Sequence, residues 1–290
     1  MLGILLIDKP AGITSHDVVN TIRRRFGTRR VGHAGTLDPE ATGLLVVAVG
    51  PATRFLQYLP LEPKEYVGAV TFGEERDTQD SEGQVVALKP VPGDLLPQLN
   101  EIMPRFRGLI QQLPPMYSAV KKAGKPLYAY ARQGKEVERT PRTIHIESLT
   151  IEKVEGADVT IRVVCSGGTY MRTLAHDLGQ EIGCGAYLSW LNREKVGKFT
   201  IAQATALDKI TLDHLISLRE ALPPVPVVAL NGTQAASVRE GRAVTVSKNY
   251  MGPVAGLLGP EGSIIGVARV FGNLLQPECV IPIEAAHDSV

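Results

Sequence analysis

The sequence Pro-Pro-Val-Pro at residues 223–226 divides this chain of 290 residues into two unequal parts. Proline fixes φ near −65° and has no backbone N–H, so the segment can neither continue a helix nor lie inside a sheet. Residues 1–222 are long enough for a large domain, whereas residues 223–290 hold short apolar runs separated by Gly and Pro. We therefore expect a large N-terminal domain followed by a small β-rich domain.

The apolar spacing of residues 1–222 mixes strands and helices in an irregular order. Strands are predicted at residues 3–8, 44–49, 64–72, 85–88, 143–154 and 157–166, and helices at residues 15–26, 94–102, 170–182 after a Thr169 cap, and 211–222. A regular strand–helix–strand repeat, which would favour a parallel sheet, is missing. The sequence therefore predicts an α+β fold with a mixed, mostly antiparallel sheet flanked by helices.

Composition excludes several classes of protein. The chain is 44% hydrophobic and 21% charged, which is typical of a globular protein, and no apolar run approaches the roughly 18 residues of a membrane helix. The three cysteines are too few and too widely spaced for a disulfide framework, and no signal peptide is recognisable, so we expect a cytoplasmic protein. The six scattered histidines and the absence of a Walker A or dinucleotide motif predict no metal site and no cofactor.

One glycine-rich segment could carry chemistry. Residues 32–43 read Gly-His-Ala-Gly-Thr-Leu-Asp-Pro-Glu-Ala-Thr-Gly. Asp38 precedes Pro39, which favours an extended backbone outside a helix, so its carboxylate is held on a loop. A catalytic carboxylate and an ordinary Asx turn both fit this pattern.

Positive charge is concentrated in two segments, although the net charge of the chain is only +1. Residues 20–33 hold five arginines and no acid, and residues 105–142 hold nine Lys or Arg against two Glu, a net charge of +7. Three tyrosines, Tyr117, Tyr128 and Tyr130, lie among the basic residues of the second segment. Basic and aromatic side chains together suit phosphate contacts and base stacking, but a solvated flexible loop has the same composition.

A third segment joins a predicted strand to a predicted helix. It runs from Cys165 to Arg172 with the sequence Cys-Ser-Gly-Gly-Thr-Tyr-Met-Arg. If the backbone is extended here, Tyr170 and Arg172 point to the same face, and the guanidinium could hold a carboxylate with two hydrogen bonds. The other interpretation is an ordinary helix start.

Five segments, taken in order, resemble motifs of the TruB family of bacterial tRNA pseudouridine synthases, over residues 1–222. They are Asp8 to Ser15 (Asp-Lys-Pro-Ala-Gly-Ile-Thr-Ser), the segment 32–43, Lys64-Glu65-Tyr66 with Asp77-Thr78 and Asp80 downstream, Pro114 to Lys121 (Pro-Pro-Met-Tyr-Ser-Ala-Val-Lys), and Cys165 to Arg172. Each motif is weak alone, and the ordered set is specific.

The resemblance implies a pseudouridine synthase fold that isomerises uridine 55 in the T loop of tRNA. The N1–C1′ bond breaks, the uracil rotates, and C5 joins C1′, a reaction that needs no cofactor. It also implies an RNA-gripping insertion at about residues 114–142, a PUA-like RNA-binding domain at residues 223–290, and a monomer that requires no protein partner.

The resemblance also assigns roles to individual side chains. Asp38 would be the essential carboxylate, Tyr66 would stack on the base and take a proton from C5, and Arg172 would pair with Asp38. Tyr170 and Leu191 would line the pocket, His33 would stabilise the opened T loop, and Lys9 and Lys121 would bind substrate. Arg172 is expected to lower the pKa of Asp38 by about 1–3 units.

Three alternatives remain open from the sequence. A non-catalytic RNA-binding protein could use the same scaffold, and a related enzyme could work inside a ribonucleoprotein, although the chain lacks long basic extensions. A nucleoside hydrolase usually needs two paired carboxylates, and only Asp38 stands in a candidate loop. Whether Asp38 attacks C1′, attacks the uracil ring or removes a ribose proton is also undecided.

Overall fold

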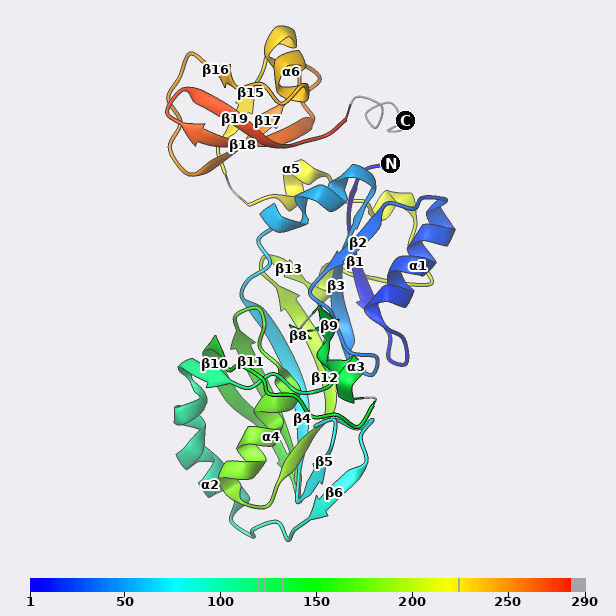
Figure 1. Ribbon diagram of the computed structural model, residues 1–290, viewed down its shortest axis with the longest axis vertical. Helices are drawn as coiled ribbons and strands as arrows, with labels where there is room; N and C mark the ends of the chain where they lie inside the picture. Colours follow the sequence, from blue (N-terminus) through cyan, green and yellow to red (C-terminus); the bar gives the residue numbers. More distant parts are fainter. Residues whose placement is uncertain (119, 123, 132, 224, 283–290) are drawn as a thin grey trace.

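A ten-stranded sheet runs through the larger part of the computed structural model, which describes residues 1–118, 120–122, 124–131, 133–223 and 225–282 (Figure 1). Its strands are β1 (Gly3–Lys9), β2 (Val31–Ala34), β3 (Thr42–Val49), β4 (Lys64–Phe72), β7 (Gly108–Gln112), β10 (Arg142–Glu155), β11 (Asp158–Cys165), β12 (Ala186–Val196), β13 (Phe199–Thr200) and β14 (Thr205–Ala206). The main order is β14-β1-β3-β12-β4-β11-β10-β7. Only the β1–β14 and β3–β12 pairs are parallel among the described strands of this sheet, which confirms the mixed, mostly antiparallel sheet.

Short helices flank this sheet. They are α1 (Ser15–Phe26), α2 (Leu95–Ile102), α3 (Leu127–Ala131), α4 (Met171–Ile182) and α5 (Leu218–Ala221), with 3₁₀ helices η1 (Gly50–Tyr58), η2 (Met103–Phe106), η3 (Ile201–Gln203) and η4 (Leu212–His214). The α1 prediction is confirmed: Thr14 forms a capping box with Asp17, and Gly27 ends the helix in the left-handed conformation. Within the part of the chain that the structure describes, we find no helix with the length and apolar character needed to span a bilayer.

One helix prediction is wrong, and in a second, correctly predicted helix the cap residue differs. Residues 211–222 do not form one helix, because Ile216 is extended and exchanges two backbone hydrogen bonds with Ile4 of β1, at 2.9 and 2.8 Å. Helix α4 begins at Met171 with Tyr170 as its N-cap, since the Thr169 hydroxyl donates to the carbonyl of Ser166 instead. Residues 170–172 are therefore not an extended segment, and Arg172 lies in the first turn of α4.

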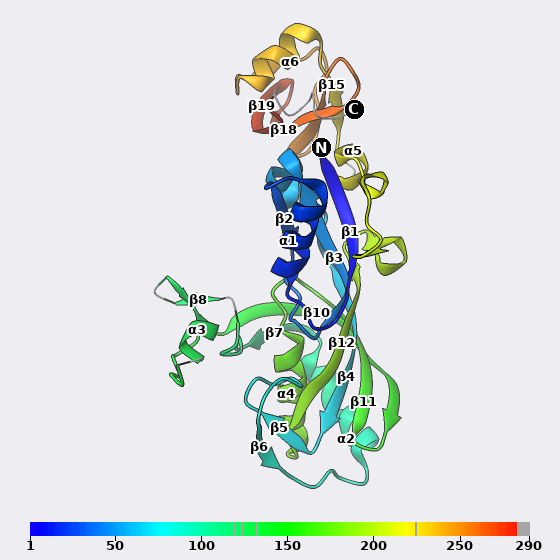
Figure 2. The same cartoon turned by 90° about the vertical axis from the view of Figure 1, so that its right-hand side faces the viewer.

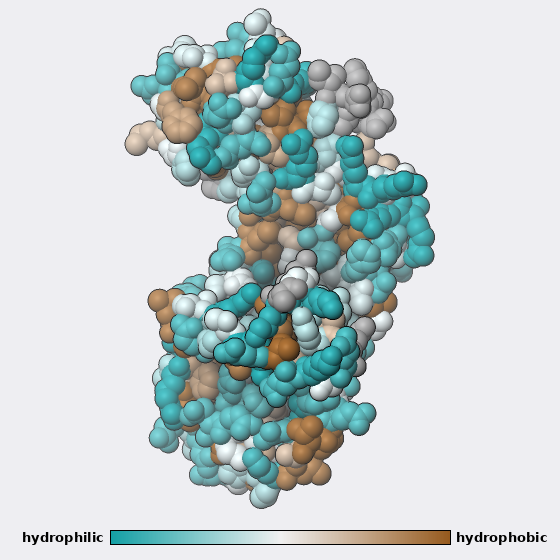
Figure 3. Space-filling model, in the orientation of Figure 1, coloured by the Kyte–Doolittle hydropathy of each residue, from teal (hydrophilic) through white to brown (hydrophobic). Residues whose placement is uncertain are grey.

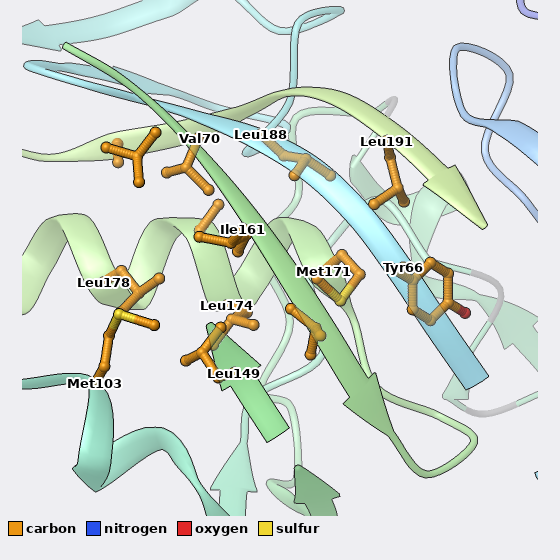
Figure 4. Packing of buried hydrophobic residues seen from close by; sticks show 14 of the residues in the cluster. Tyr66, Val70, Met103, Leu149, Ile161, Met171, Leu174, Leu178, Leu188 and Leu191 are labelled. Carbon is orange, nitrogen blue, oxygen red and sulfur yellow. The ribbon is translucent and has the colours of Figure 1, made fainter. Parts of the chain in front are cut away.

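Two hydrophobic clusters, under α4 and under α1, lie on one face of the sheet, and a third, which includes Phe55 of η1, lies on the other face. Helices α4 and α2 pack on the β4–β12 end, where Leu174, Leu178 and Met103 lie beneath Val70 and Leu188 (Figure 4). Helix α1 covers β1 and β3 through Val18, Val19 and Ile22, which are at most 2% exposed. These two clusters hold β3, β12 and β4 side by side at the centre of the sheet.

Strand β12 lies at the centre of this sheet although no strand was predicted there. It pairs with β4 on one side and β3 on the other. Its second half reads Leu-Asn-Arg-Glu-Lys-Val, a pattern typical of a solvated segment, but Arg193 is fully buried. The strand therefore depends on partners that are distant in the sequence.

The residues after the proline-rich segment form a second, five-stranded sheet. Its strands are β15 (Val227–Ala229), β16 (Val244–Thr245), β17 (Val254–Leu258), β18 (Ile264–Phe271) and β19 (Leu274–Val280), in the order β15-β17-β18-β19-β16, with α6 (Gly232–Arg239) packed beside them. Ile264, Val267 and Cys279 share a cluster with Phe55 of η1, so the two sheets are joined by apolar contacts. Figure 3 shows the molecule hollowed on one side between them.

Two small hairpins project from the larger sheet. Strands β8 (Lys121–Lys122) and β9 (Lys125–Pro126) lie with α3 in an arm that stands away from the body of the molecule (Figure 2). Strands β5 (Glu74–Arg76) and β6 (Val85–Leu88) form the other hairpin, whose apolar outer side is visible in Figure 3.

Gly43 allows β3 to approach β12, and its replacement is expected to weaken this contact. Its φ is +98°, and an added Cβ would lie 2.3 Å from the Asn192 Oδ1 atom and 2.4 Å from the Arg193 carbonyl oxygen. Gly43→Ala should lower the free energy of unfolding by at least about 3 kcal/mol, measured by urea denaturation. Gly156→Ala is the control, since its φ is +63° but nothing lies within 4 Å. That variant should lose about 1–2 kcal/mol, and equal losses would contradict the steric explanation.

Candidate active site

Asp38 lies on the segment 35–41 between β2 and β3, called the Asp38 loop below. Ser15, at the start of α1, is 1% exposed and holds both backbone groups of Leu37. Its hydroxyl donates to the Leu37 carbonyl at 3.0 Å and accepts from the Leu37 amide at 2.9 Å. The residue next to Asp38 is therefore fixed by the N-terminus of α1.

Lys9, at the end of β1, holds the other half of the loop. Its ammonium group donates to the carbonyl oxygens of Pro10, Pro39 and Ala41 at 2.8, 2.8 and 2.7 Å. An ammonium has three N–H groups, and all three are used here. The predicted role of Lys9 in substrate binding does not fit these contacts, because a fully buried lysine with no free donor holds backbone rather than phosphate.

Burial also changes the acidity of this lysine. Removal of the ammonium from water lowers the pKa of Lys9 to about 8, and the nearby carboxylates of Glu40 and Asp38 oppose that change. Lys9 therefore places a cation behind the Asp38 loop at neutral pH.

Arg193 of β12 is a third buried group that binds the loop. Its Nε donates to the Leu44 carbonyl at 2.8 Å, and one Nη donates to the Gly35 carbonyl at 2.7 Å. Gly35 begins the Asp38 loop and Leu44 belongs to β3, so Arg193 ties the loop to both central strands. It is also the guanidinium close to Tyr66 of β4.

Asp38 faces Arg172 from the first turn of α4. The Arg172 Nε lies 3.0 Å from Asp38 Oδ2, and an Nη of Arg172 donates to Oδ1 at 3.3 Å. The guanidinium thus contacts both carboxylate oxygens, the geometry expected of a strong ion pair. The N-terminus of α4 adds a partial positive charge on the same side.

The same guanidinium binds a second carboxylate, that of Asp80. The other Nη of Arg172 lies 3.0 Å from Asp80 Oδ2, while Asp80 Oδ1 accepts from the Thr78 hydroxyl at 2.6 Å and from the Glu82 amide at 3.1 Å. The Arg172 and Asp80 side chains are only 7% and 11% exposed. Asp80 is therefore a carboxylate fixed by hydrogen bonds within its own turn, and it fixes the position of the Arg172 guanidinium.

The turn that carries Asp80 is itself constrained. Gln79 has φ of +66°, an uncommon value for a residue with a side chain. Its carbonyl accepts from the Leu188 amide at 3.0 Å, and its side chain accepts from the Thr173 hydroxyl at 3.1 Å. These contacts from β12 and α4 keep Asp80 against Arg172.

The pKa of Asp38 is raised above its usual value of 3.8. Desolvation is the largest cause, and the negative charge of Asp80 adds to it. Arg172, Lys9 and Arg193 act in the opposite direction without reversing the shift. Arg172 therefore does lower the pKa of Asp38, as expected, but desolvation and the charge of Asp80 outweigh it and the net shift is upward.

Five of the predicted site residues line one cavity of about 390 Å³: Asp38, Tyr66, Tyr170, Arg172 and Leu191. The Tyr66 ring from β4 lies near Leu191 of β12 and Met171 of α4 (Figure 4). Burial raises the pKa of Tyr66, and Arg193 opposes this change. The cavity, called the Asp38 cavity below, thus combines a carboxylate, an aromatic face and an apolar wall.

Gln112 connects this cavity to the projecting arm. It is 2% exposed, its side-chain amide donates to the Tyr170 carbonyl at 3.0 Å, and its side-chain oxygen accepts from the Tyr170 amide at 2.8 Å. A few residues later, the Tyr117 carbonyl accepts from Arg172 at 2.8 Å. The base of the arm therefore holds the N-terminus of α4 at two points.

Besides Lys9, two predicted site residues do not line the Asp38 cavity. His33 lies on β2, where burial lowers its pKa and its Nδ1 has no protein partner. Lys121 lies on β8, and its side chain is outside the described residues, as is Arg132. In the described ranges no group of His, Cys, Asp or Glu is arranged to hold a metal ion.

Three residues of the site were not predicted from the sequence as site residues: Asp80, Gln112 and Arg193. Asp80 was noted only within a motif and an acidic loop, and its neighbour Thr78 was the available signal. No local pattern distinguishes Gln112 or Arg193 from surface polar residues, because their partners lie 58 and 149 positions away in the sequence.

Comparison with known families matches most of the larger part of the chain. The N-terminal domain of TruB family pseudouridylate synthase matches residues 23–171, and the C-terminal domain of tRNA pseudouridylate synthase B matches residues 172–225. Asp38 and Tyr66 fall in the first match, and Arg172 and Leu191 fall in the second.

Individual relatives extend the similarity to nearly the whole chain. Proteins named tRNA pseudouridine synthase B from Azoarcus sp. (strain BH72) and Thermobifida fusca are 42% and 41% identical, covering 98% and 96% of this chain and 96% and 98% of their own. One from Syntrophotalea carbinolica is 50% identical over 78% of this chain and 76% of its own. Among solved structures, a Cbf5-Nop10-Gar1 complex contains a chain that is 26% identical, with a TM-score of 0.67 over 98% of this chain and 86% of that one.

The shared guanidinium makes a testable prediction about acidity. In the wild-type protein the Asp38 carboxyl should titrate above 3.8, as followed by carbon-13 NMR of labelled aspartate with Asp38→Asn to assign the signal. In Asp80→Asn the titration should move to lower pH, because a negative charge is removed and Arg172 is no longer shared. Asp77→Asn, in the same turn, is the control and should leave the titration in place. A titration of Asp38 that does not change in Asp80→Asn would refute the electrostatic account.

Proposed function

The chain belongs to the TruB family of pseudouridylate synthases and isomerises a uridine of tRNA to pseudouridine, and from this premise we propose that its target is uridine 55 in the T loop, with Asp38 as the essential carboxylate. The observation that carries the proposal is the ion pair of Asp38 with Arg172 at the Asp38 cavity, beside Tyr66 and Leu191.

The reaction places definite demands on this cavity. The N1–C1′ bond breaks, the C5–C1′ bond forms, C5 loses a proton and N1 gains one, so no atom is lost and no external oxidant or reductant enters. Each route that starts at a carboxylate, whether attack on C1′, attack on the ring or removal of a ribose proton, needs Asp38 ionised. A raised pKa makes that carboxylate a stronger base and nucleophile, and Arg172 keeps it oriented.

Tyr66 and Leu191 account for binding of the base. A uridine inside the T loop is stacked on its neighbours, so it must be flipped out at a cost of a few kcal/mol. Stacking on the Tyr66 ring returns about 1–3 kcal/mol. Leu191, which is 7% exposed, forms the apolar wall against the uracil and excludes water that would trap the detached sugar.

Tyr66 also has a hydroxyl that can take part in proton transfer. We propose that the Tyr66 oxygen, after its own proton has left to solvent, accepts the proton released from C5. Burial raises the pKa of Tyr66, and the nearby Arg193 guanidinium opposes that shift and so limits the cost of forming the phenolate.

The projecting arm accounts for the grip on RNA. Lys122 and Lys125 are exposed on β8 and β9, and the rings of Tyr117 and Tyr128 line the Asp38 cavity at the base of the arm. Basic groups beside aromatic rings suit an RNA strand that enters the cavity. We propose that residues 114–142 hold the T arm while Tyr117 and Gln112 connect that contact to α4.

We further propose that the enzyme acts as a monomer without a protein partner, since this chain itself supplies the carboxylate, the guanidinium, the aromatic ring and the apolar wall that the reaction requires. In the same proposal the domain boundary lies at residues 222–223, and the β-rich C-terminal part is a PUA-like domain that contacts RNA outside the Asp38 cavity. The nucleoside hydrolase alternative needs a second free carboxylate, and Asp80, which shares Arg172 with Asp38, is held by Arg172, the Thr78 hydroxyl and the Glu82 backbone amide.

Asp38→Asn tests the catalytic assignment. It should lower the rate of pseudouridine formation in a T stem-loop transcript by at least about 10³-fold, since the side chain can no longer act as base or nucleophile. Binding of the transcript should stay within about tenfold of the wild type, because the amide keeps the shape of the carboxylate. Asp213→Asn, a surface change on η4, is the control. Undiminished isomerisation in Asp38→Asn would remove Asp38 from the mechanism, and release of free uracil by the wild type would favour the hydrolase.

Tyr66→Phe separates stacking from proton transfer. The ring remains, so the Kd for a T stem-loop should change little. The single-turnover rate should fall by about 10²–10⁴-fold, the usual contribution of general acid–base catalysis. If rate and affinity fall equally, or if only affinity falls, the hydroxyl has no role in proton transfer.

A further inference from the structure

A second cavity, of about 1010 Å³, lies on the opposite face of β12 from the Asp38 cavity and is called the Trp190 cavity below. Leu191 lines the Asp38 cavity and Trp190 lines this one. Trp190 also borders a small recess beside Asp38 and Arg172, so the two cavities lie close together at β12. Its walls come from α1, the end of β1, β12 and the segment 201–208. Figure 2 shows α1 beside β1 on the same side of the sheet as α4, so the cavity extends past the end of β1 from the Trp190 face toward α1.

The aromatic side chain in this cavity is exposed to solvent. Trp190, the only tryptophan of the chain, is 45% exposed. Apolar groups of Ile201, Ala206 and Leu207 line the cavity with it. An exposed indole at the wall of a cavity offers a flat surface for stacking, and base–aromatic stacking is the interaction it suits best.

Cations line the same cavity. No residue of the arginine-rich segment 20–33 lines the Asp38 cavity. Arg24 and Arg25 of this segment line the Trp190 cavity instead. Arg25 donates to the carbonyls of Leu207 and Asp208 at 3.0 and 2.7 Å, which holds the rim. Arg24 is exposed and donates only to the Thr21 hydroxyl, at 3.3 Å. Among the described residues neither arginine has a carboxylate within 4 Å, so Arg24 can reach a phosphate.

Acceptors complete the lining. Asp8 is exposed at the end of β1, Asp208 stands at the rim, and Asn192 lies beside Trp190 on β12. Carboxylate and amide oxygens accept hydrogen bonds from the exocyclic amino group of a base and from ribose hydroxyls. An aromatic face, a free guanidinium and carboxylate acceptors together match a single unstacked nucleotide.

We propose that the Trp190 cavity binds one unpaired nucleotide of tRNA from outside the T arm, stacked on Trp190 with its phosphate at Arg24. This inference rests on the proposed function, since it takes tRNA as the substrate. A tRNA nucleotide fits better than a free nucleotide because Trp190 is adjacent in the chain to Leu191. An RNA held at the Asp38 cavity therefore brings its other unpaired segments close at high effective concentration.

The test compares full-length tRNA with an isolated T stem-loop as substrates. Trp190→Ala should raise the KM for full-length tRNA about tenfold, the loss expected from one stacked base, with kcat unchanged. The same variant should convert the T stem-loop as the wild type does. Trp190→Phe should restore most of the affinity for full-length tRNA. Arg24→Ala should weaken the binding of full-length tRNA and reduce the salt dependence of the KM for full-length tRNA by about one phosphate contact. Arg219→Ala on α5 should change neither the binding nor its salt dependence.

Each other outcome contradicts the proposal. Equal losses of Trp190→Ala on both substrates would mean that Trp190 acts by packing on β12, and no loss on either would mean that the cavity binds no part of tRNA. Inhibition by adenosine monophosphate that disappears in Trp190→Ala, without an effect on tRNA, would assign the cavity to a free nucleotide. Failure of the wild type to modify the T stem-loop would instead refute the proposed function, and this arm is read independently of the Trp190 variants.

Discussion

The position of the Asp38 loop depends on polar side chains buried beneath it. Lys9, Ser15 and Arg193 come from β1, α1 and β12, and each donates to backbone carbonyl oxygens of the loop. Two of these groups are cations, and a buried cation costs several kcal/mol unless its hydrogen bonds are satisfied. The loop carbonyls satisfy them, and the cations in turn fix a segment with little regular structure. The position of the Asp38 carboxylate therefore depends on how the three elements that carry these groups pack together.

Arg172 fixes the two carboxylates in position, as the buried cations fix the backbone of the loop. One guanidinium binds Asp38 and Asp80, and carbonyls from two other segments accept its remaining donors. Sharing the positive charge leaves the pair of carboxylates with a net negative charge, so Asp38 is oriented without being strongly acidified. This balance suits an isomerase, which needs one reactive carboxylate, and it removes Asp80 from the free role that a hydrolase would require.

The distribution of charge explains how a chain with net charge +1 acts on RNA. Exposed charges are screened beyond about 8–10 Å at physiological ionic strength, so local clusters rather than the sum determine binding. The basic clusters lie in the projecting arm and on α1, both on the same side of the larger sheet as α4 (Figure 2). Such a surface favours one folded RNA held in one orientation over general coating of nucleic acid.

The sequence by itself determined the elements whose signals are local. The helix α1 follows from the Thr14 cap and the spacing of Val18 and Ile22, and the ordered motifs place Asp38, Tyr66 and Arg172 in one family's site. Only the tertiary structure decided β12, the interruption at Ile216, the roles of Lys9 and Asp80, and the raised pKa of Asp38. Each of these depends on a partner far along the chain, such as the Leu44 carbonyl 149 residues from Arg193, or on the burial that such partners create together. The local sequence pattern indicates the secondary structure that a residue favours among its sequence neighbours. Desolvation and long-range hydrogen bonds exist only once the sheet has formed.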